Sequence, residues 1–114
     1  MQRGGLRVYT LGASKVLRGI TFDAGDVVTI DEWDDYDAGV PMIRLAGERV
    51  IQGRRYPEGS AVYLYGWLCR RVSVRLGADT ILDRVGYRTN TVLEFDRRGR
   101  LARVLPPRAE GLYR

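Results

Sequence analysis

The stretch of this sequence with the clearest chemical potential is YLYGWLCRR, residues 63–71. Three aromatic residues alternate along it, so a β-strand would place their rings on one face. Rings beside arginines can stack on bases or sugars, while the guanidinium groups bind phosphate. The alternatives are that the rings cover the second side of a sheet or contact another subunit. A ligand- or partner-binding surface is therefore predicted at Tyr63, Tyr65, Trp67, Arg70, Arg71 and Arg75.

A second candidate is the acidic segment DEWDDYDAG, residues 31–39. Clustered carboxylates can bind calcium, but the glycine and glutamate of an EF-hand loop are absent at the required offsets. The segment is typical of a solvated hairpin tip. If it has a partner, an arginine-rich surface is expected, with the aromatic residues as anchors. The residues predicted to contact such a partner are Trp33, Asp34, Asp35, Tyr36 and Asp37.

The charge of the chain is unusual in type and in distribution. Eighteen of the nineteen basic residues are arginine, which is typical of a GC-rich genome and also of bidentate binding to phosphate or carboxylate. Residues 1–40 carry four positive and seven negative charges, net −3, whereas residues 41–114 carry fifteen and seven, net +8. This asymmetry favours head-to-tail association, and the basic part could follow a nucleic-acid backbone.

Catalysis has little support in the sequence. The chain has no histidine, which removes the usual general base and the commonest metal ligand. Cys69 is the only cysteine, so it has no disulfide partner in the chain and no histidine to activate it. No glycine-rich phosphate loop is recognisable. We therefore expect a protein that is not an enzyme, with no cofactor and no metal site.

The first fifteen residues contain no apolar run long enough for a signal peptide, and no run in the sequence approaches the roughly 20 apolar residues that a membrane span needs. A soluble cytoplasmic protein without a membrane partner is expected.

The elements that would position these candidates form an internal repeat. Three segments align without gaps: SKVLRGITFDAGDVVTID, ERVIQGRRYPEGSAVYLY and DTILDRVGYRTNTVLEFD. Six of the eighteen aligned positions are apolar or aromatic in all three segments. A seventh holds Gly25, Gly59 and Asn90, residue types that readily adopt a left-handed backbone. The sequence therefore predicts three tandem copies of one unit.

Each unit is predicted to contain about three short strands. The first ends at a leucine (Leu11, Leu45 or Leu76), and Leu105 marks a fourth such strand. The second runs to an aromatic residue, and DAGD, PEGS or RTNT then forms a tight hairpin with a type I turn. The third alternates, which predicts a buried face made of Val28, Ile30, Val62, Leu64, Leu93 and Phe95.

These elements predict one all-β domain over residues 1–114. It is expected to be an antiparallel β-meander of about ten short strands, built from three tandem repeats plus a closing strand, and rolled or barrel-like. The units cover approximately residues 6–40, 41–71 and 72–100, with the closing strand and tail at 101–114.

Three functions are compatible with this sequence. The first is a non-catalytic interaction or scaffold module that contacts another protein or further copies of itself, because short repeats commonly build extended binding surfaces. The second is a nucleic-acid-binding module that uses arginines and the aromatic strip. The third is a carbohydrate-binding module that uses the same strip.

Overall fold

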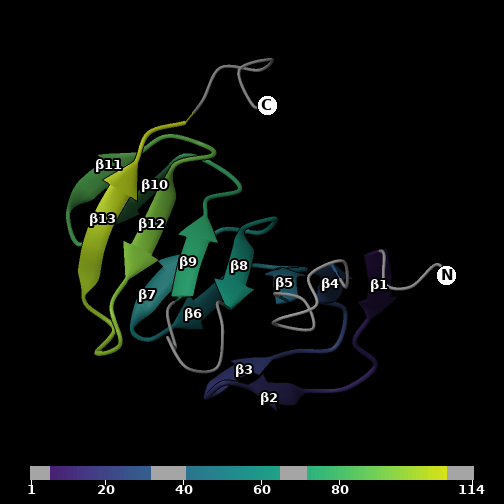
Figure 1. Cartoon of the computed structure of the whole chain (residues 1–114). Helices are drawn as coiled ribbons and strands as arrows, with labels where there is room; N and C mark the ends of the chain where they lie inside the picture. Colours follow the sequence, from purple (N-terminus) through teal and green to yellow (C-terminus); the bar gives the residue numbers. More distant parts are fainter. Residues whose placement is uncertain (1–5, 32–40, 65–71, 108–114) are drawn as a thin grey trace, which may run out of the picture.

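The computed structural model describes residues 6–31, 41–64 and 72–107 (Figure 1). Within these ranges the chain forms thirteen strands, all paired antiparallel, and contains no helix. The prediction of an antiparallel all-β fold is confirmed. The described part of the chain has no helix able to cross a membrane.

Seven strands form one continuous sheet in the order β1-β4-β5-β8-β9-β12-β13. Their bounds are β1 Leu6–Thr10, β4 Val27–Asp31, β5 Pro41–Arg44, β8 Ala61–Leu64, β9 Val72–Arg75, β12 Val92–Phe95 and β13 Leu101–Leu105. Between β1 and β4, β5 and β8, and β9 and β12, the chain leaves the sheet to make a small hairpin. The six hairpin strands are β2 Lys15–Leu17, β3 Ile20–Phe22, β6 Arg49–Ile51, β7 Arg54–Tyr56, β10 Thr80–Leu82 and β11 Val85–Tyr87.

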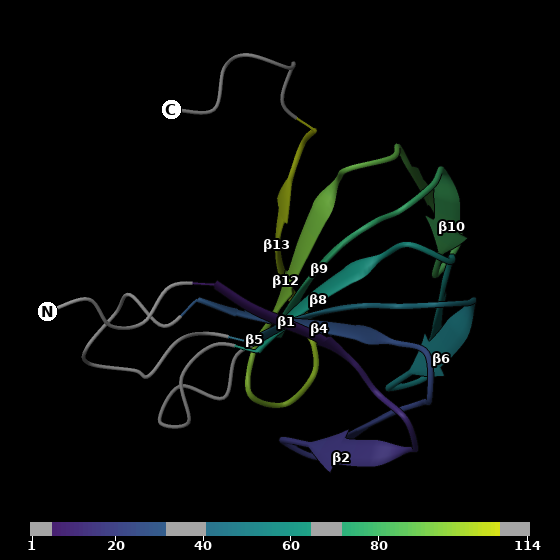
Figure 2. The same cartoon turned by 90° about the vertical axis from the view of Figure 1, so that its right-hand side faces the viewer.

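The three hairpins form a second layer on one side of the sheet (Figure 2). We call the sheet face that they cover the inner face and the opposite one the outer face. The sheet remains open, with β1 and β13 as its edges, and no pairing among the described residues closes it. The predicted rolled or barrel-like form is therefore not confirmed, and the hairpin layer covers the inner face (Figure 2).

The hairpins correct the predicted strand count. Each predicted second strand is two strands joined by a two-residue turn, which accounts for thirteen strands rather than about ten. Both turn residues have positive φ, as a type I′ turn requires. The turn residues are Arg18 (51°) and Gly19 (82°), Gln52 (52°) and Gly53 (81°), and Asp83 (51°) and Arg84 (71°).

The segments DAGD, PEGS and RTNT return the chain from each hairpin to the sheet. Gly25, Gly59 and Asn90 have the predicted positive φ, at 97°, 85° and 72°. Their turns are nevertheless type II rather than type I, because positive φ occurs only at the third residue and the fourth N–H bonds to the first carbonyl. They join strands that do not pair with each other, so they are not hairpin turns.

The core lies between the two layers. The sheet contributes a cross-strand row in which every residue is 1% exposed or less: Val28, Ile43, Val62, Val74 and Leu93. The hairpins contribute Ile20, Phe22, Ile51, Tyr56 and Leu82, each 5% exposed or less. Of the six residues predicted to form a buried face, five are buried and Ile30 is partly buried against the core.

Polar contacts connect successive hairpins to the sheet at two junctions. At the first, the fully buried carboxylate of Asp26 accepts a hydrogen bond from the Ala46 N–H (2.9 Å) and binds the Arg49 guanidinium through two contacts of 2.6 and 2.9 Å. At the second, the Ser60 hydroxyl accepts from the Gly77 N–H at 3.0 Å. The two junctions have matching backbone hydrogen bonds, and among the described residues only the first contains an ion pair.

The pairing of β13 shows that the predicted equivalence of Leu105 with Leu11, Leu45 and Leu76 is wrong. Leu105 pairs with Val92, which on its other side pairs with Arg75. The position that matches Leu76 in β9 is therefore Pro106, not Leu105. Because proline has no N–H, a further strand could not receive a hydrogen bond from this position.

Candidate functional site: the outer face of the sheet

Two of the predicted binding residues, Tyr63 and Arg75, lie in described strands, and the structure brings them together. Arg75 stands over the Tyr63 ring, with 5.9 Å between its guanidinium carbon and the ring centroid, within the range of a cation–π contact. The other predicted residues fall outside the described ranges: Tyr65, Trp67, Arg70, Arg71, Trp33, Asp34, Asp35, Tyr36 and Asp37.

Strand alternation places this pair on the outer face. Tyr63 lies between Val62 and Leu64 in β8, and both neighbours are fully buried on the inner face. Arg75 pairs with Ala61, which precedes Tyr63 by two residues on the same strand and therefore shares its face. Tyr63 and Arg75 are each partly exposed.

A third residue, Arg44, belongs to this site and was missing from the predicted set. It lies opposite Ala61 on the other neighbouring strand, β5, so Ala61 has an arginine on each side. The Arg44 guanidinium donates a hydrogen bond to the Gly59 carbonyl at 3.2 Å. Ala61 itself is fully buried. The alternation of PMIR, with Ile43 buried, is the sequence signal that would have placed Arg44 here.

The outer face is positively charged among its described side chains. Its acidic residue, Glu94, accepts a hydrogen bond from Arg103 at 2.9 Å, so its charge is balanced. Arg44 and Arg75 have no acidic partner among the described residues. The site, which we call the outer-face arginine pair, therefore presents two uncompensated guanidinium groups with an aromatic ring beside one of them.

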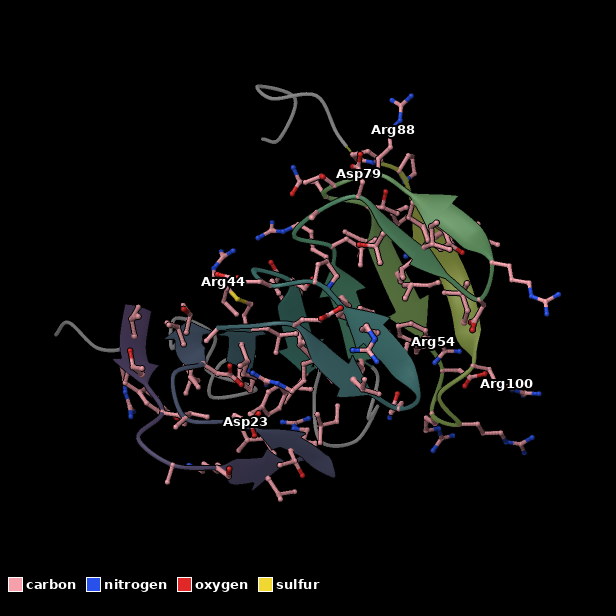
Figure 3. The ribbon with its side chains drawn as sticks, turned by 180° about the vertical axis from the view of Figure 1, so that it is seen from behind. Asp23, Arg44, Arg54, Asp79, Arg88 and Arg100 are labelled. Carbon is pink, nitrogen blue, oxygen red and sulfur yellow. The ribbon has the colours of Figure 1, made fainter. Side chains whose placement is uncertain are left out.

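Other arginines are used differently (Figure 3). Arg54 binds Asp83 at 3.4 Å, donates to the Gly99 carbonyl at 3.1 Å and stacks 4.6 Å from the centroid of the Phe95 ring. It therefore connects the second hairpin to the third and to the β12–β13 turn. Such a residue stabilises the fold and has little freedom to bind a ligand.

The β12–β13 turn itself exposes Arg97 and Arg98 without an acidic partner among the described residues. Both follow Asp96, whose carboxylate accepts hydrogen bonds from the backbone N–H groups of Arg98 and Arg100. These hydrogen bonds, led by the one from Arg100, hold the pKa of Asp96 below its ordinary value. The carboxylate therefore stays charged beside the two arginines and reduces the positive potential of this turn.

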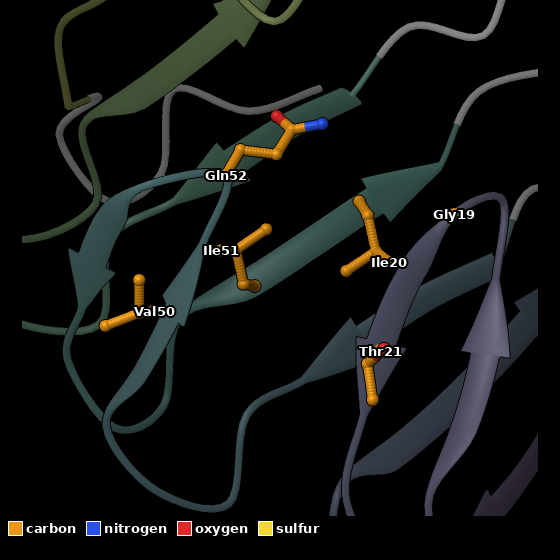
Figure 4. Close-up of a pocket in the computed structure, with 6 residues that line it drawn as sticks. All are labelled: Gly19, Ile20, Thr21, Val50, Ile51 and Gln52. Atoms are coloured by element: carbon orange, nitrogen blue, oxygen red, sulfur yellow. The ribbon is translucent and has the colours of Figure 1, made fainter.

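A small cleft of about 180 Å³ separates the first two hairpins (Figure 4). Its lining residues are Gly19, Ile20, Thr21, Val50, Ile51 and Gln52. None of these side chains carries a charge, and Thr21 provides the one hydroxyl group among them. The described residues also contain no cluster of three or more His, Cys, Asp or Glu side chains suited to a metal ion.

No protein-family model matches the sequence, and comparisons with curated proteins and with solved structures found no match. The chemistry of the described site is therefore the guide to function. Two guanidinium groups and a phenol ring can bind an anion or a planar group.

Proposed function

We propose that this protein is a non-catalytic scaffold module that associates with further copies of itself. The observation that carries the proposal is that core positions lie open at the C-terminal end of the two layers. Leu101, Val104 and Val85 are 41%, 40% and 48% exposed, although strand register points all three toward the inside. We call this surface the open end.

The open end continues the hydrophobic core. Val104 extends the cross-strand row that contains Val74 and Leu93, which are 1% and 0% exposed. Val85 holds in the third hairpin the position that Ile20 holds in the first, since each pairs with the last residue of the preceding strand. Ile20 is only 5% exposed and lines the cleft between the first and second hairpins, whereas no further hairpin follows the third among the described residues. An added copy would extend the sheet beyond Val104 and place its first hairpin on the side that Val85 faces, with β13 between that hairpin's strand pair and the third hairpin's.

A second copy of the chain fits this end by placing its β1 beside β13. Since every neighbouring pair in the sheet is antiparallel, β1 and β13 run in the same direction, and a head-to-tail join would pair them in parallel. Both hairpin layers would then lie on one side, and Tyr9 of the second copy would continue the row after Val104. The net charges of −3 and +8 on the two parts of the sequence favour this polarity.

The assembly proposal includes a proposal about the fold, namely that the chain consists of three tandem repeats and a closing strand. In support, the three hairpins have the same length and register, and each is inserted between two neighbouring sheet strands. A repeat array leaves apolar core residues uncovered at its last unit. Further units or capping elements bind at such ends.

The experiment is analytical ultracentrifugation across a wide concentration range at low and high salt. The test variant is Val85→Lys/Val104→Lys, which places charges at the open end. The matched control is Ile81→Lys, because Ile81 belongs to the same hairpin and is 76% exposed, but faces away from the sheet.

The wild-type mass should rise with concentration, the control should behave like the wild type, and the test variant should remain monomeric. Thermal melting by circular dichroism verifies that all three proteins fold. A wild type that stays monomeric at every concentration and ionic strength overturns the proposal, as does association that the test variant leaves unchanged.

A further inference from the structure

We propose that the outer-face arginine pair is a binding site for the phosphate backbone of single-stranded nucleic acid. This function is separate from self-association, since the open end belongs to the inner face and to the last strands. The proposal rests on the position of Arg44 and Arg75, on the charge around them and on the aromatic ring that accompanies them.

The pair is positioned by rigid elements. Arg44 and Arg75 lie on strands either side of β8, so their Cα atoms stand about 10 Å apart, given about 4.8 Å between neighbouring strands. Their guanidinium groups lean in opposite directions along β8, toward the Gly59 carbonyl and the Tyr63 ring respectively. This arrangement suits contacts to separate phosphates of one strand better than the capture of a single small anion.

Local charge favours a polyanion. The acidic residue nearest to the pair along the register is Glu94, and Arg103 already binds it. Neither Arg44 nor Arg75 is offset by a described carboxylate, whereas the exposed Arg97 and Arg98 stand beside Asp96. Among the described side chains the positive potential around this site therefore comes from the pair, and a planar guanidinium loses less entropy per hydrogen bond than an ammonium group does.

The aromatic component favours a single strand over a duplex. Sheet faces bind unpaired nucleic acid by combining arginine–phosphate contacts with aromatic rings on which bases stack. Tyr63 shares the face with both arginines, and the hairpin layer covers the opposite face (Figure 2). A duplex would offer phosphates to the arginines but no unpaired base to stack on the ring.

The test uses fluorescence anisotropy with a labelled single-stranded oligonucleotide over a series of salt concentrations. The variant is Arg44→Gln/Arg75→Gln, and the control is Arg97→Gln/Arg98→Gln, which removes the same two charges from the β12–β13 turn. Melting temperatures measured by circular dichroism verify folding, and Arg44→Lys/Arg75→Lys restores the charge without the planar group.

The outer-face variant should bind at least about tenfold more weakly, and the slope of log K against log salt should fall by about 1.4, or 0.7 for each lost phosphate contact. The control should lose less than about threefold, and the lysine variant should recover the salt slope. If the variant and the control lost the same affinity for the oligonucleotide, the effect would be explained by net charge alone, and the proposed site would be overturned.

Three further results would also overturn it: no binding by the wild type, tighter binding of a duplex, or tighter binding of polyglutamate than of the oligonucleotide. Inorganic phosphate should compete only at much higher concentration, because it provides one contact at a time. A wild type that binds the oligonucleotide as a monomer would separate this site from the self-association proposal.

Discussion

The first junction contains the buried ion pair between Asp26 and Arg49, and its removal should lower the stability of the whole domain. The Asp26 carboxylate is fully buried, and Arg49 binds it from the second hairpin. Arg49 also contacts Asp23, at 3.1 Å. At the second junction the matching residues are Ser60 and Thr80, so the substitutions Asp26→Ser and Arg49→Thr convert the first junction into the second.

The stability lost in each single substitution depends on which charged group remains without its partner. Asp26→Ser keeps an acceptor for the Ala46 N–H but removes the main partner of Arg49. Arg49→Thr leaves a buried carboxylate held only by backbone donors. Breaking a buried ion pair by removing one partner costs about 3–5 kcal/mol. Because Arg49 keeps its contact with Asp23, we expect Asp26→Ser to lower the free energy of unfolding by about 3 kcal/mol. This corresponds to a fall in Tm of about 12 °C for a chain of this size.

The double substitution should cost clearly less than the sum of the two, with a coupling of about 1.5–3 kcal/mol. Urea unfolding monitored by far-ultraviolet circular dichroism at neutral pH measures all four corners of the cycle. Strict additivity, or single substitutions that cost under about 1 kcal/mol, would refute the reasoning.

Acid gives an independent test of the same contact. Burial raises the pKa of Asp26, but hydrogen bonds from Arg49 and from the backbone of Ala46 and Asp23 outweigh it and hold the pKa below its ordinary value. A depressed folded-state pKa means that the stabilisation is present above the unfolded value of about 3.9 and is lost as the pH falls further. The wild type should therefore lose stability below about pH 4 more steeply than Asp26→Ser.

Three other predictions concern stability. Gly77→Ala should destabilise by about 1–3 kcal/mol in urea unfolding, because the added Cβ would stand 2.5 Å from a backbone oxygen; Gly47→Ala, with open space around it, should stay within about 0.5 kcal/mol. Arg84→Gly should stabilise by about 0.5–1 kcal/mol by relieving a positive φ of 71°, and Gly53→Arg should do the reverse. Burial raises the pKa of Tyr56 to about 12, so up to about 2.7 kcal/mol of stability should be lost as the pH rises from 10 to 12, and Tyr56→Phe should lack this loss.

Much of the fold was accessible from the sequence, because alternation in strands is a strong local signal. Val62 and Leu64 were assigned to the core and Tyr63 to the opposite face on this signal alone. The three hairpins were missed for a local reason as well. Two of their turns contain a single glycine, and the third, Asp83-Arg84, contains none, so the sequence signal for a type I′ turn is weak in all three.

The candidate site was predicted only in part, because its members come from different strands. Tyr63 and Arg75 were identified from a contiguous run of aromatic and basic residues. Arg44 is distant in sequence and becomes a neighbour only through the pairing of β5 with β8. Arg54 shows the converse: it is a basic residue beside a turn, yet it contacts Asp83 and Gly99, and these contacts depend on how the hairpins and turns meet.

The open end is the central claim, and amide hydrogen exchange followed by NMR as a function of protein concentration tests it most directly. Head-to-tail association predicts that protection rises with concentration in β13 and β11, around Val104 and Val85, and in β1 of the joining copy, while β6 and β7 stay unchanged. Protection in β13 and β11 that is independent of concentration, or a rise confined to other strands, would contradict it.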